Sequence, residues 1–254
     1  MSKIKIKTKK EIELIRSAGA LAAETLVRAG EMCKPGVSTL EVDEFIADFT
    51  NKHGGISADF GYYGYPRYSC ISINEVVCHG IPSKDTILKD GDIVNIDITT
   101  ILSGYHGDCS AMFCVGNVSE QAKDLVKVTK ECMEEGIRAA AMPKARFSDI
   151  GCAIQPYAED HGYTVVRDYC GHGIGRGFHE EPNVLHYANR EINNMIEIGN
   201  VFTIEPMINM GTWKVFIDSE DPYGWEVISG DELPSAQWEH TFLMTEHGVE
   251  ILTY

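Results

Sequence analysis

Four acidic residues stand in or beside stretches that read as β-strands, where an unpaired charge is costly. They are Asp97, Asp108, Glu205 and Glu239. Ile93 to Ile101 and Tyr105 to Val115 are β-rich runs separated by Ser103-Gly104, which predicts a hairpin. A turn centred near residues 102 and 103 places Asp97 opposite Asp108. Like charges that face each other in a sheet destabilise it unless a cation lies between them.

The chain offers no such cation near the hairpin, because no lysine or arginine occurs between Asp92 and Val118. The second strand pair repeats the situation with Glu205 and Glu239, so we expect four carboxylates to converge. That is too much negative charge for one divalent ion to balance, whereas two ions about 3.5–4 Å apart suit it. The sequence therefore predicts a two-metal site.

The fifth expected ligand is His172, within Gly171-His-Gly-Ile-Gly175, where glycines let the backbone approach closely. An oxygen-rich set with one nitrogen and no thiolate favours Mn(II), Fe(II) or Co(II) over structural zinc. The same glycines resemble a dinucleotide-binding loop, but Pro182 follows where the helix of that motif should begin. His179-Glu180 lacks the HExxH spacing of a zinc peptidase.

The elements that position these residues recur at a constant offset of 108 residues. In each half a proline precedes an amphipathic stretch that ends in His-Gly, at His53 and at His161. In each half a predicted strand then ends in a carboxylate, at Asp97 and at Glu205. The second half carries an insertion before Glu239 that is rich in glycine and holds Trp213 and Trp225. This insertion is expected to be an irregular excursion between two strands.

Composition and charge narrow the class of protein. The 254 residues are 44% hydrophobic and 24% charged, which is typical of a globular protein, and one compact domain over residues 1–254 is expected. A net charge of −16 argues against DNA as a partner. Neither a signal peptide nor a membrane-spanning run is recognisable, and eight cysteines without a CxxC pair read as reduced thiols, so a cytoplasmic location is expected. The lysine-rich first ten residues read as a solvated terminus rather than an RNA-binding patch.

The ligand order resembles that of the dinuclear metallopeptidases with the pita-bread fold and, within them, the type I methionine aminopeptidases. The matching segments include Ile73-Asn-Glu-Val-Val-Cys-His79-Gly-Ile-Pro82, His106-Gly-Asp108, Gly171-His-Gly-Ile-Gly175, Phe178-His179-Glu-Glu-Pro182, Thr203-Ile-Glu205-Pro206 and Ser235-Ala-Gln-Trp-Glu239-His-Thr241. The resemblance implies an α+β fold with two pseudo-symmetric halves, roughly 12–116 and 120–248, around a central curved antiparallel sheet covered by helices. It also implies removal of the N-terminal methionine from nascent proteins and peptides before a small second residue.

The resemblance assigns roles to particular residues. Asp108 and Glu239 would bridge the two metals, Asp97 would bind one, and His172 with Glu205 would bind the other. The implied catalytic residues are His79, His179 and Glu205, with the two histidines contacting substrate and Glu205 shuttling a proton. The implied methionine pocket is formed by Tyr62, Tyr65, Cys70, Phe178 and Trp225. Asp59 and Tyr63 depart from the cysteine and histidine that are common at these positions, which bears on the pocket rim.

Further partners also follow from the resemblance. It implies a monovalent cation near Asn74, Val76 and Ser235, transient contact with the ribosome, and a monomer without a membrane partner. Two other functions stay open. A prolidase or Xaa-Pro aminopeptidase shares the ligands but usually carries a further N-terminal domain, and a metal-free relative that acts as a binding module would have lost ligands.

Overall fold

A computed structural model describes residues 4–190 and 193–254. Its helices are α1 (Lys9–Gly30), α2 (Thr39–Lys52), α3 (Glu120–Ala140) and α4 (Phe147–Asp160), with a 3-10 turn η1 (Tyr62–Gly64). Its strands are β1 (Ile56–Ser57), β2 (Cys70–Ile73), β3 (Val76–Cys78), β4 (Ile93–Leu102), β5 (Tyr105–Cys114), β6 (Thr164–Val165), β7 (Gly171–Gly173), β8 (Glu180–Val184), β9 (Val201–Ile204), β10 (Met207–Asn209), β11 (Val215–Ile217), β12 (Val227–Ser229), β13 (Ser235–Gln237), β14 (His240–Thr245) and β15 (Gly248–Ile251). Among the described residues, no helix is long and apolar enough to cross a membrane.

The first two helices begin at matched polar caps. Thr8 and Ser38 each accept a hydrogen bond from the backbone three residues on, and the glutamate at that position bonds back to the cap. This reciprocal box satisfies amide groups that a helix start otherwise leaves without a partner. Both helices are therefore fixed at their N-terminal ends by sequence-local contacts.

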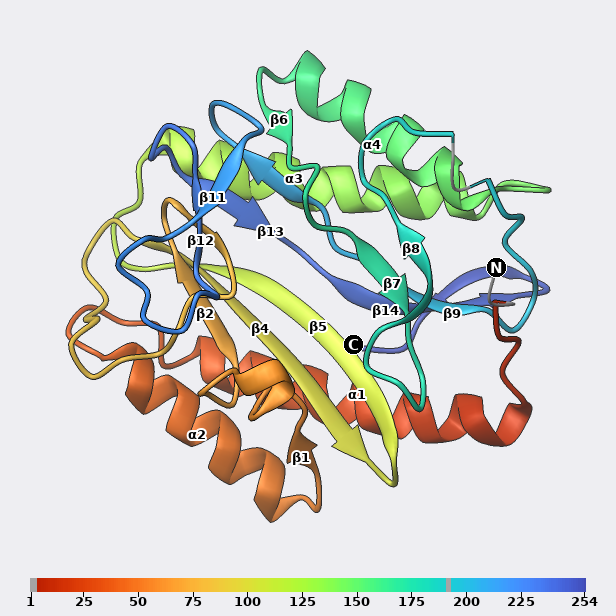
Figure 1. Cartoon of the computed structure of the whole chain (residues 1–254), viewed down its shortest axis with the longest axis horizontal. Helices are drawn as coiled ribbons and strands as arrows, with labels where there is room; N and C mark the ends of the chain where they lie inside the picture. Colours follow the sequence, from red (N-terminus) through yellow and green to blue (C-terminus); the bar gives the residue numbers. More distant parts are fainter. Residues whose placement is uncertain (1–3, 191–192) are drawn as a thin grey trace.

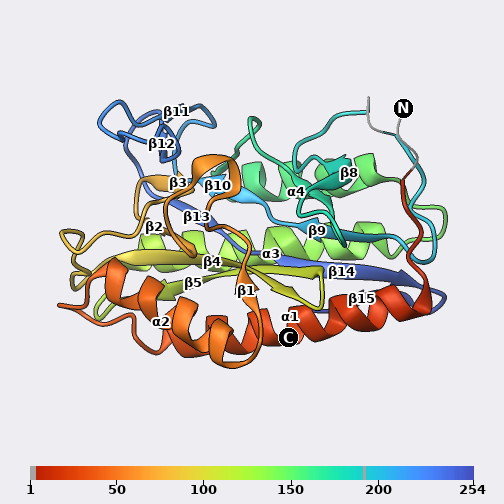
Figure 2. The ribbon, with the colours of Figure 1, turned by 60° about the horizontal axis from the view of Figure 1, so that its bottom comes forward.

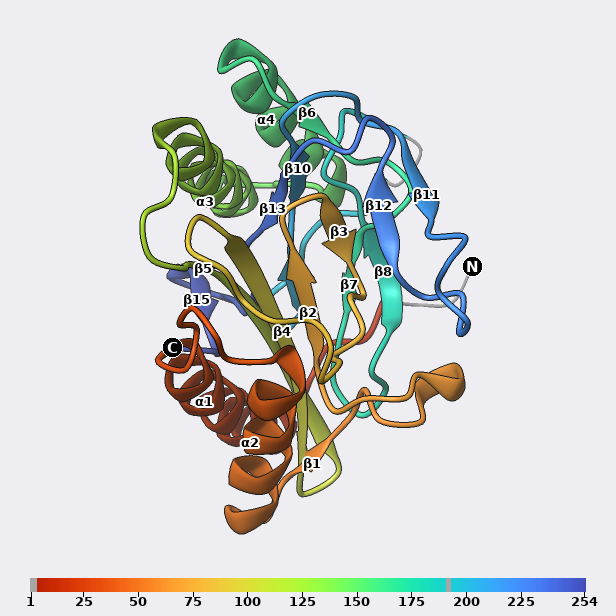
Figure 3. The same cartoon turned by 90° about the vertical axis from the view of Figure 1, so that its left-hand side faces the viewer.

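A central antiparallel sheet runs through both halves of the chain. β4 pairs with β2 and β5 in the first half, and β14 pairs with β9 and β15 in the second. An antiparallel bridge between Ser110 and Glu239 joins the halves. Figure 3 shows the four helices on one side of these strands and β3, β8, β11 and β12 on the other. The predicted α+β architecture with two pseudo-symmetric halves is confirmed.

Equivalent elements of the two halves start 108 residues apart. This holds for α2 and α4, for β1 and β6, and for β4 and β9. In Figure 1, α1 and α2 lie along one edge of the view and α3 and α4 along the opposite edge, with the sheet between them. Each half thus supplies its own helix pair to the same face of the sheet.

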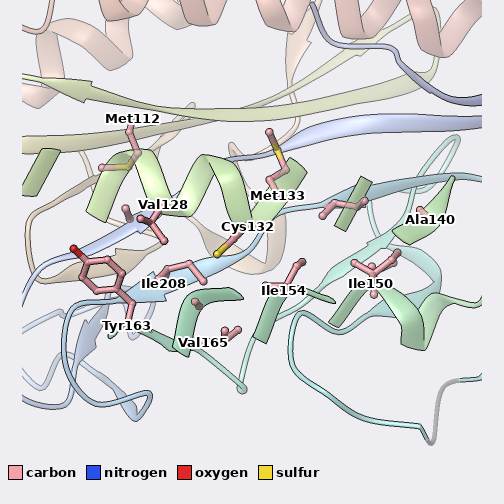
Figure 4. Packing of buried hydrophobic residues seen from close by; sticks show 14 of the residues in the cluster. Met112, Val128, Cys132, Met133, Ala140, Ile150, Ile154, Tyr163, Val165 and Ile208 are labelled. Atoms are coloured by element: carbon pink, nitrogen blue, oxygen red, sulfur yellow. The ribbon is translucent and has the colours of Figure 1, made fainter. Parts of the chain in front are cut away.

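Each helix pair has its own apolar core against the sheet. In the first half, Ile46 of α2 packs with Ile96 and Ile98 of β4. In the second, Ile150 and Ile154 of α4 pack with residues of α3 and of the strands, as Figure 4 shows around Val128, Cys132 and Ile208. Burying such side chains stabilises the fold by about 1.5–3 kcal/mol each. The rigid sheet that carries the acidic residues rests on these cores.

The hairpin of β4 and β5 corrects one prediction. Its loop is Ser103-Gly104, with φ angles of 54° and 79°, the left-handed conformation that a two-residue hairpin loop requires. The ladder therefore pairs Asp97 with Ser110 and Asp108 with Thr99, so the expected direct opposition of Asp97 and Asp108 is wrong. Asp97 also lies in the middle of β4 rather than at its end.

The insertion of the second half is also more regular than expected. Its residues form the antiparallel pair β11 and β12, and β12 pairs with β3 of the first half. Val227 lies opposite Cys78 in this ladder, which brings the neighbouring Trp225 next to His79. Cross-strand pairing therefore turns the insertion into one wall of the site.

Candidate metal centre

Three of the four predicted carboxylates lie in one row across the central sheet. Asp97 pairs with Ser110, and Ser110 pairs with Glu239. The register on either side of Glu239 then places Glu205 opposite it, because His240 pairs with Ile204 and Gln237 with Met207. Asp108 is in the adjacent row, where its backbone and the Thr241 hydroxyl exchange two hydrogen bonds.

Strand alternation sends these carboxylates to the face that the helices leave open. Ile96 and Ile98 are fully buried against α1 and α2, so Asp97 between them points the other way. Ile204 is likewise buried against the second helix pair, and Glu205 follows it. Figure 2 shows α1 and α2 beneath β4 and β5, with β3 above them.

His172 completes a compact buried group. Asp108, His172 and Glu239 offer ligand atoms that all lie within 4.8 Å of one another. Nε2 of His172 lies 3.5 Å from Asp108 Oδ2 and 3.6 Å from Glu205 Oε1, while its Nδ1 lies 3.0 Å from the Gly173 carbonyl. Donation from Nδ1 to that carbonyl leaves the Nε2 lone pair facing the carboxylates, as in a metal-binding histidine.

Neighbouring hydroxyls hold the acidic side chains in place. Thr203 Oγ1 donates to Glu205 Oε1 at 2.6 Å and accepts from the His172 amide at 3.0 Å. Thr99 Oγ1 donates to Asp108 Oδ1 at 2.8 Å. Thr99 lies two residues after Asp97 and Thr203 two residues before Glu205, so each threonine shares the strand face of a predicted ligand. This period-two signal was missed in the sequence analysis.

His186 contacts the backbone of Glu205, and no sequence motif indicated this role. Its Nε2 accepts a hydrogen bond from the Glu205 amide at 3.1 Å. Burial, and then the charge on His172, lowers the pKa of His186 to about 3, so the ring is neutral and accepts that bond at neutral pH. His186 therefore fixes the backbone of Glu205.

The electrostatics of the group favour a bound cation. Burial, reinforced by Asp108 and Asp59, raises the pKa of Asp97 well above its usual range. Burial and the neighbouring acids also raise the pKa of Glu239 well above its usual range, and burial raises that of Glu205 to about 7. Among the described residues, Glu239 Oε1 is buried without a hydrogen-bond partner. These donors fit a divalent metal, which would displace the protons that the carboxyls hold in its absence and would give Glu239 Oε1 a partner.

These pKa values predict that metal-free protein loses stability as pH rises. Histidine has an ordinary pKa of about 6.5, so the histidines of the unfolded chain are almost all neutral above pH 7.5, and the lowered pKa values of buried histidines no longer affect stability there. The raised pKa values of Asp97 and Glu239 mean that the folded form binds protons that the unfolded chain has released. We therefore expect the Tm of chelator-treated protein to fall from about pH 7.5 to 8.5, and to fall less in Glu239→Gln. Scanning calorimetry across this range tests the expectation, and a Tm that rises equally in both proteins contradicts it.

The two predicted substrate histidines face the same space from different elements. His79 follows β3 with a φ of 58°, and its ring meets Trp225 edge-on at 5.5 Å. The His179 ring lies 4.1 Å from that of His172, and its Nδ1 lies 2.8 Å from the Tyr62 hydroxyl. Burial lowers the pKa of both His79 and His179 to about 4, so both rings are neutral at pH 7.

One cavity is lined by all the predicted metal-binding, substrate-binding and catalytic residues. The residues predicted from the sequence that line it are Tyr62, Tyr65, Cys70, His79, Asp97, Asp108, His172, Phe178, His179, Glu205, Trp225 and Glu239. Sequence reasoning missed Cys78, Thr99, Met207 and Gln237, which also line it. Asp59 lies in the wall, buried and bonded to the Thr99 amide, whereas Tyr63 is 85% exposed and does not line the cavity.

The fold and the buried acidic centre define a metallopeptidase, and the comparisons with known proteins agree. The model of metallopeptidase family M24 matches residues 13–246, so the chain belongs to that family. Within it, the chain is similar to the methionine aminopeptidase of Escherichia coli strain K12, at 50% identity over 98% of this chain and 94% of that protein.

Solved structures give the same result. The crystal structure of methionine aminopeptidase from Rickettsia prowazekii matches with a TM-score of 0.95 at 47% identity, covering 99% of this chain and 100% of that one. The prolidase from Pyrococcus furiosus matches with a TM-score of 0.78 at 24% identity, covering 98% of this chain and 65% of that one. At that identity the prolidase shows a shared fold alone.

Proposed function

We propose that this chain is a methionine aminopeptidase that hydrolyses the first peptide bond of nascent proteins and peptides, preferring a small second residue. One observation carries the proposal: the five predicted ligands, of which only Asp97 is not fully buried, line one cavity together with aromatic side chains and the sulfur-bearing Cys70, Cys78 and Met207. Such walls suit a methionine side chain, whose thioether is polarizable and makes favourable contacts with aromatic rings. The near-complete coverage of the E. coli and Rickettsia relatives supports it.

We propose that the centre holds two divalent ions, Co, Mn or Fe(II). Asp108 and Glu239 would be shared, with Asp97 on one side and His172 and Glu205 on the other. When bound, such ions act as Lewis acids and lower the pKa of water toward neutrality. The buried acidic donors support this assignment, and so does the Nε2 lone pair of His172, which faces them.

The protein's own groups orient the substrate and move protons. Nδ1 of His179 lies 2.8 Å from the Tyr62 hydroxyl, and we assign the hydroxyl as the donor of this hydrogen bond. In that tautomer His179 carries its proton on Nε2 and would donate it to the scissile carbonyl oxygen as negative charge develops there. His79 would contact the amide nitrogen of the scissile bond. Glu205 would carry a proton from water to the leaving amine.

Peptide hydrolysis tests the function directly. With added Mn(II) or Co(II), we expect release of methionine from Met-Gly-Met-Met, and a kcat/KM for Xaa-Pro peptides lower by about 10²-fold or more. Chromatography of the free amino acids measures both. Release from Xaa-Pro alone would favour a prolidase-type enzyme, and release from neither would favour a binding module.

We also propose that residues 1–254 form one catalytic domain that acts as a cytoplasmic monomer, with transient ribosome contact and neither DNA nor membrane as a partner. A monovalent cation would bind near Asn74, Val76 and Ser235. The Ser235 amide donates to the Asn74 carbonyl at 2.8 Å, so the first and last of these residues lie together.

A further inference from the structure

The basic N-terminal stretch has no part in the proposed function, yet it lies against the elements that carry the site. Residues 4–8 precede α1 without regular structure. The Lys7 amide donates to the Gly199 carbonyl at 2.8 Å, and Asn200 Nδ2 donates to the Lys5 carbonyl at 3.2 Å. Figure 1 shows this stretch rising from the start of α1 toward β9. It is therefore tied to the turn that leads into β9 and Glu205.

Lys7 buries its ammonium group, which is unusual for lysine. Its Nζ lies 2.6 Å from Glu180 Oε2, and the two side chains are 5% and 8% exposed. Burial opposes ionisation of Glu180, but hydrogen bonds from Lys7, the Gly177 amide and Lys5 outweigh it and lower its pKa to about 2. A buried charge that loses its partner is strongly unfavourable, so each of the two ions holds the other in place.

The loop between β7 and β8 is folded around this ion pair. The Gly177 amide donates to Glu180 Oε1 at 2.9 Å, and the Gly175 carbonyl accepts from the His106 amide at 2.9 Å. A Cβ on Gly175 would lie 2.4 Å from Lys7 Nζ, so a larger residue at that position would displace the ammonium. The alternating glycines that resemble a dinucleotide loop thus accommodate a lysine of the same chain.

His179 depends on this loop for its position. It directly precedes Glu180 in the chain, and its Nδ1 lies 2.8 Å from the Tyr62 hydroxyl. We propose that Lys7 is a positioning residue of the active site, which fixes the loop of residues 174–179 through its buried pair with Glu180 and so holds His179 beside His172. This inference rests on the function proposed above for His179.

Variants of the ion pair separate positioning from simple stabilisation. Lys7→Met and Glu180→Gln each leave one buried group without its partner, so both should lower the Tm. The double variant removes both charges and should recover most of the Tm, yet its kcat should stay about 10²-fold low with KM and bound metal unchanged, because a displacement of about 1 Å is enough for such a loss. Recovery of kcat together with the Tm would overturn the proposal.

Lys5→Ala is the matched control. Lys5 Nζ contacts the other oxygen of the same carboxylate at 3.0 Å, but Lys5 is 64% exposed. An exposed pair contributes little, so this variant should change kcat by less than about threefold. A loss in Lys5→Ala as large as in Lys7→Met would show that the buried pair is not the determinant and would also overturn the proposal.

Hydrogen exchange separates this inference from the proposed function. In metal-free protein, amides of residues 174–179 should exchange about tenfold faster in Lys7→Met than in the parent, and at the parent rate in Lys5→Ala. Mass spectrometry of the corresponding peptide measures this without any enzyme activity. Unchanged exchange in Lys7→Met sinks the positioning role. Absence of methionine release by the parent protein sinks the proposed function instead.

Discussion

Asp97→Ala is expected to lower kcat/KM for methionine release by about 10³-fold or more, because a lost metal position removes several kcal/mol of transition-state stabilisation. The same change should leave the metal-free protein at least as stable as the parent at pH 7.5. Asp97 is surrounded by Asp108, Asp59 and Glu205, which together with burial raise its pKa well above its usual range. Removing its carboxyl relieves that repulsion in the folded state.

Metal titration and calorimetry on the same sample measure both effects. Bound divalent metal per chain should fall from two to one or fewer, while the Tm of the metal-free protein stays level or rises. Asp85→Ala removes an exposed aspartate before β4 and should change neither quantity. An Asp97→Ala variant that binds two ions with the affinity of the parent would contradict the ligand assignment.

His179→Ala should lower kcat by about 10²–10³-fold, the usual cost of deleting one donor to a developing oxyanion. Two ions should remain bound, because the His179 side chain is assigned to the substrate and not to the metal. Tyr62→Phe removes the hydroxyl that lies 2.8 Å from His179 Nδ1 and should lower kcat by about tenfold. The loss is smaller because the His179 ring remains and only the position of its proton is less well fixed.

Steady-state kinetics combined with metal analysis distinguish these roles. A His179→Ala protein that loses metal would make His179 a ligand rather than a substrate contact. A Tyr62→Phe protein as inactive as His179→Ala would indicate that Tyr62 itself contacts the reacting group.

Much of the fold could be predicted from the sequence because the signals of helices and strands are local and periodic. The predicted repeat at an offset of 108 residues is matched by α2 and α4, by β1 and β6 and by β4 and β9, and strand alternation put the acidic residues on one face. Charge alone indicated a cation, since the hairpin that carries Asp97 and Asp108 contains no lysine or arginine. Family resemblance, rather than periodicity, pointed to His79 and His179.

The features that could not be predicted from the sequence depend on contacts between distant segments. The register of β4 and β5 was predicted two residues out because it is set by the backbone conformation of Ser103-Gly104. A register shift of two residues leaves each side chain on the same face of the sheet but changes its cross-strand partner. Thr99 rather than Asp97 therefore lies opposite Asp108. The burial of Lys7 could not be predicted from the sequence, because its partner Glu180 is 173 residues away.

The bridge between Ser110 and Glu239 also has a consequence for how the newly made chain gains activity. Asp97 and Asp108 come from the first half, whereas His172, Glu205 and Glu239 come from the second, so neither half alone contains the full set of proposed ligands. Pairing of segments so far apart in sequence is slow. A partly synthesised or half-folded chain is therefore expected to lack peptidase activity until its own tertiary structure is complete.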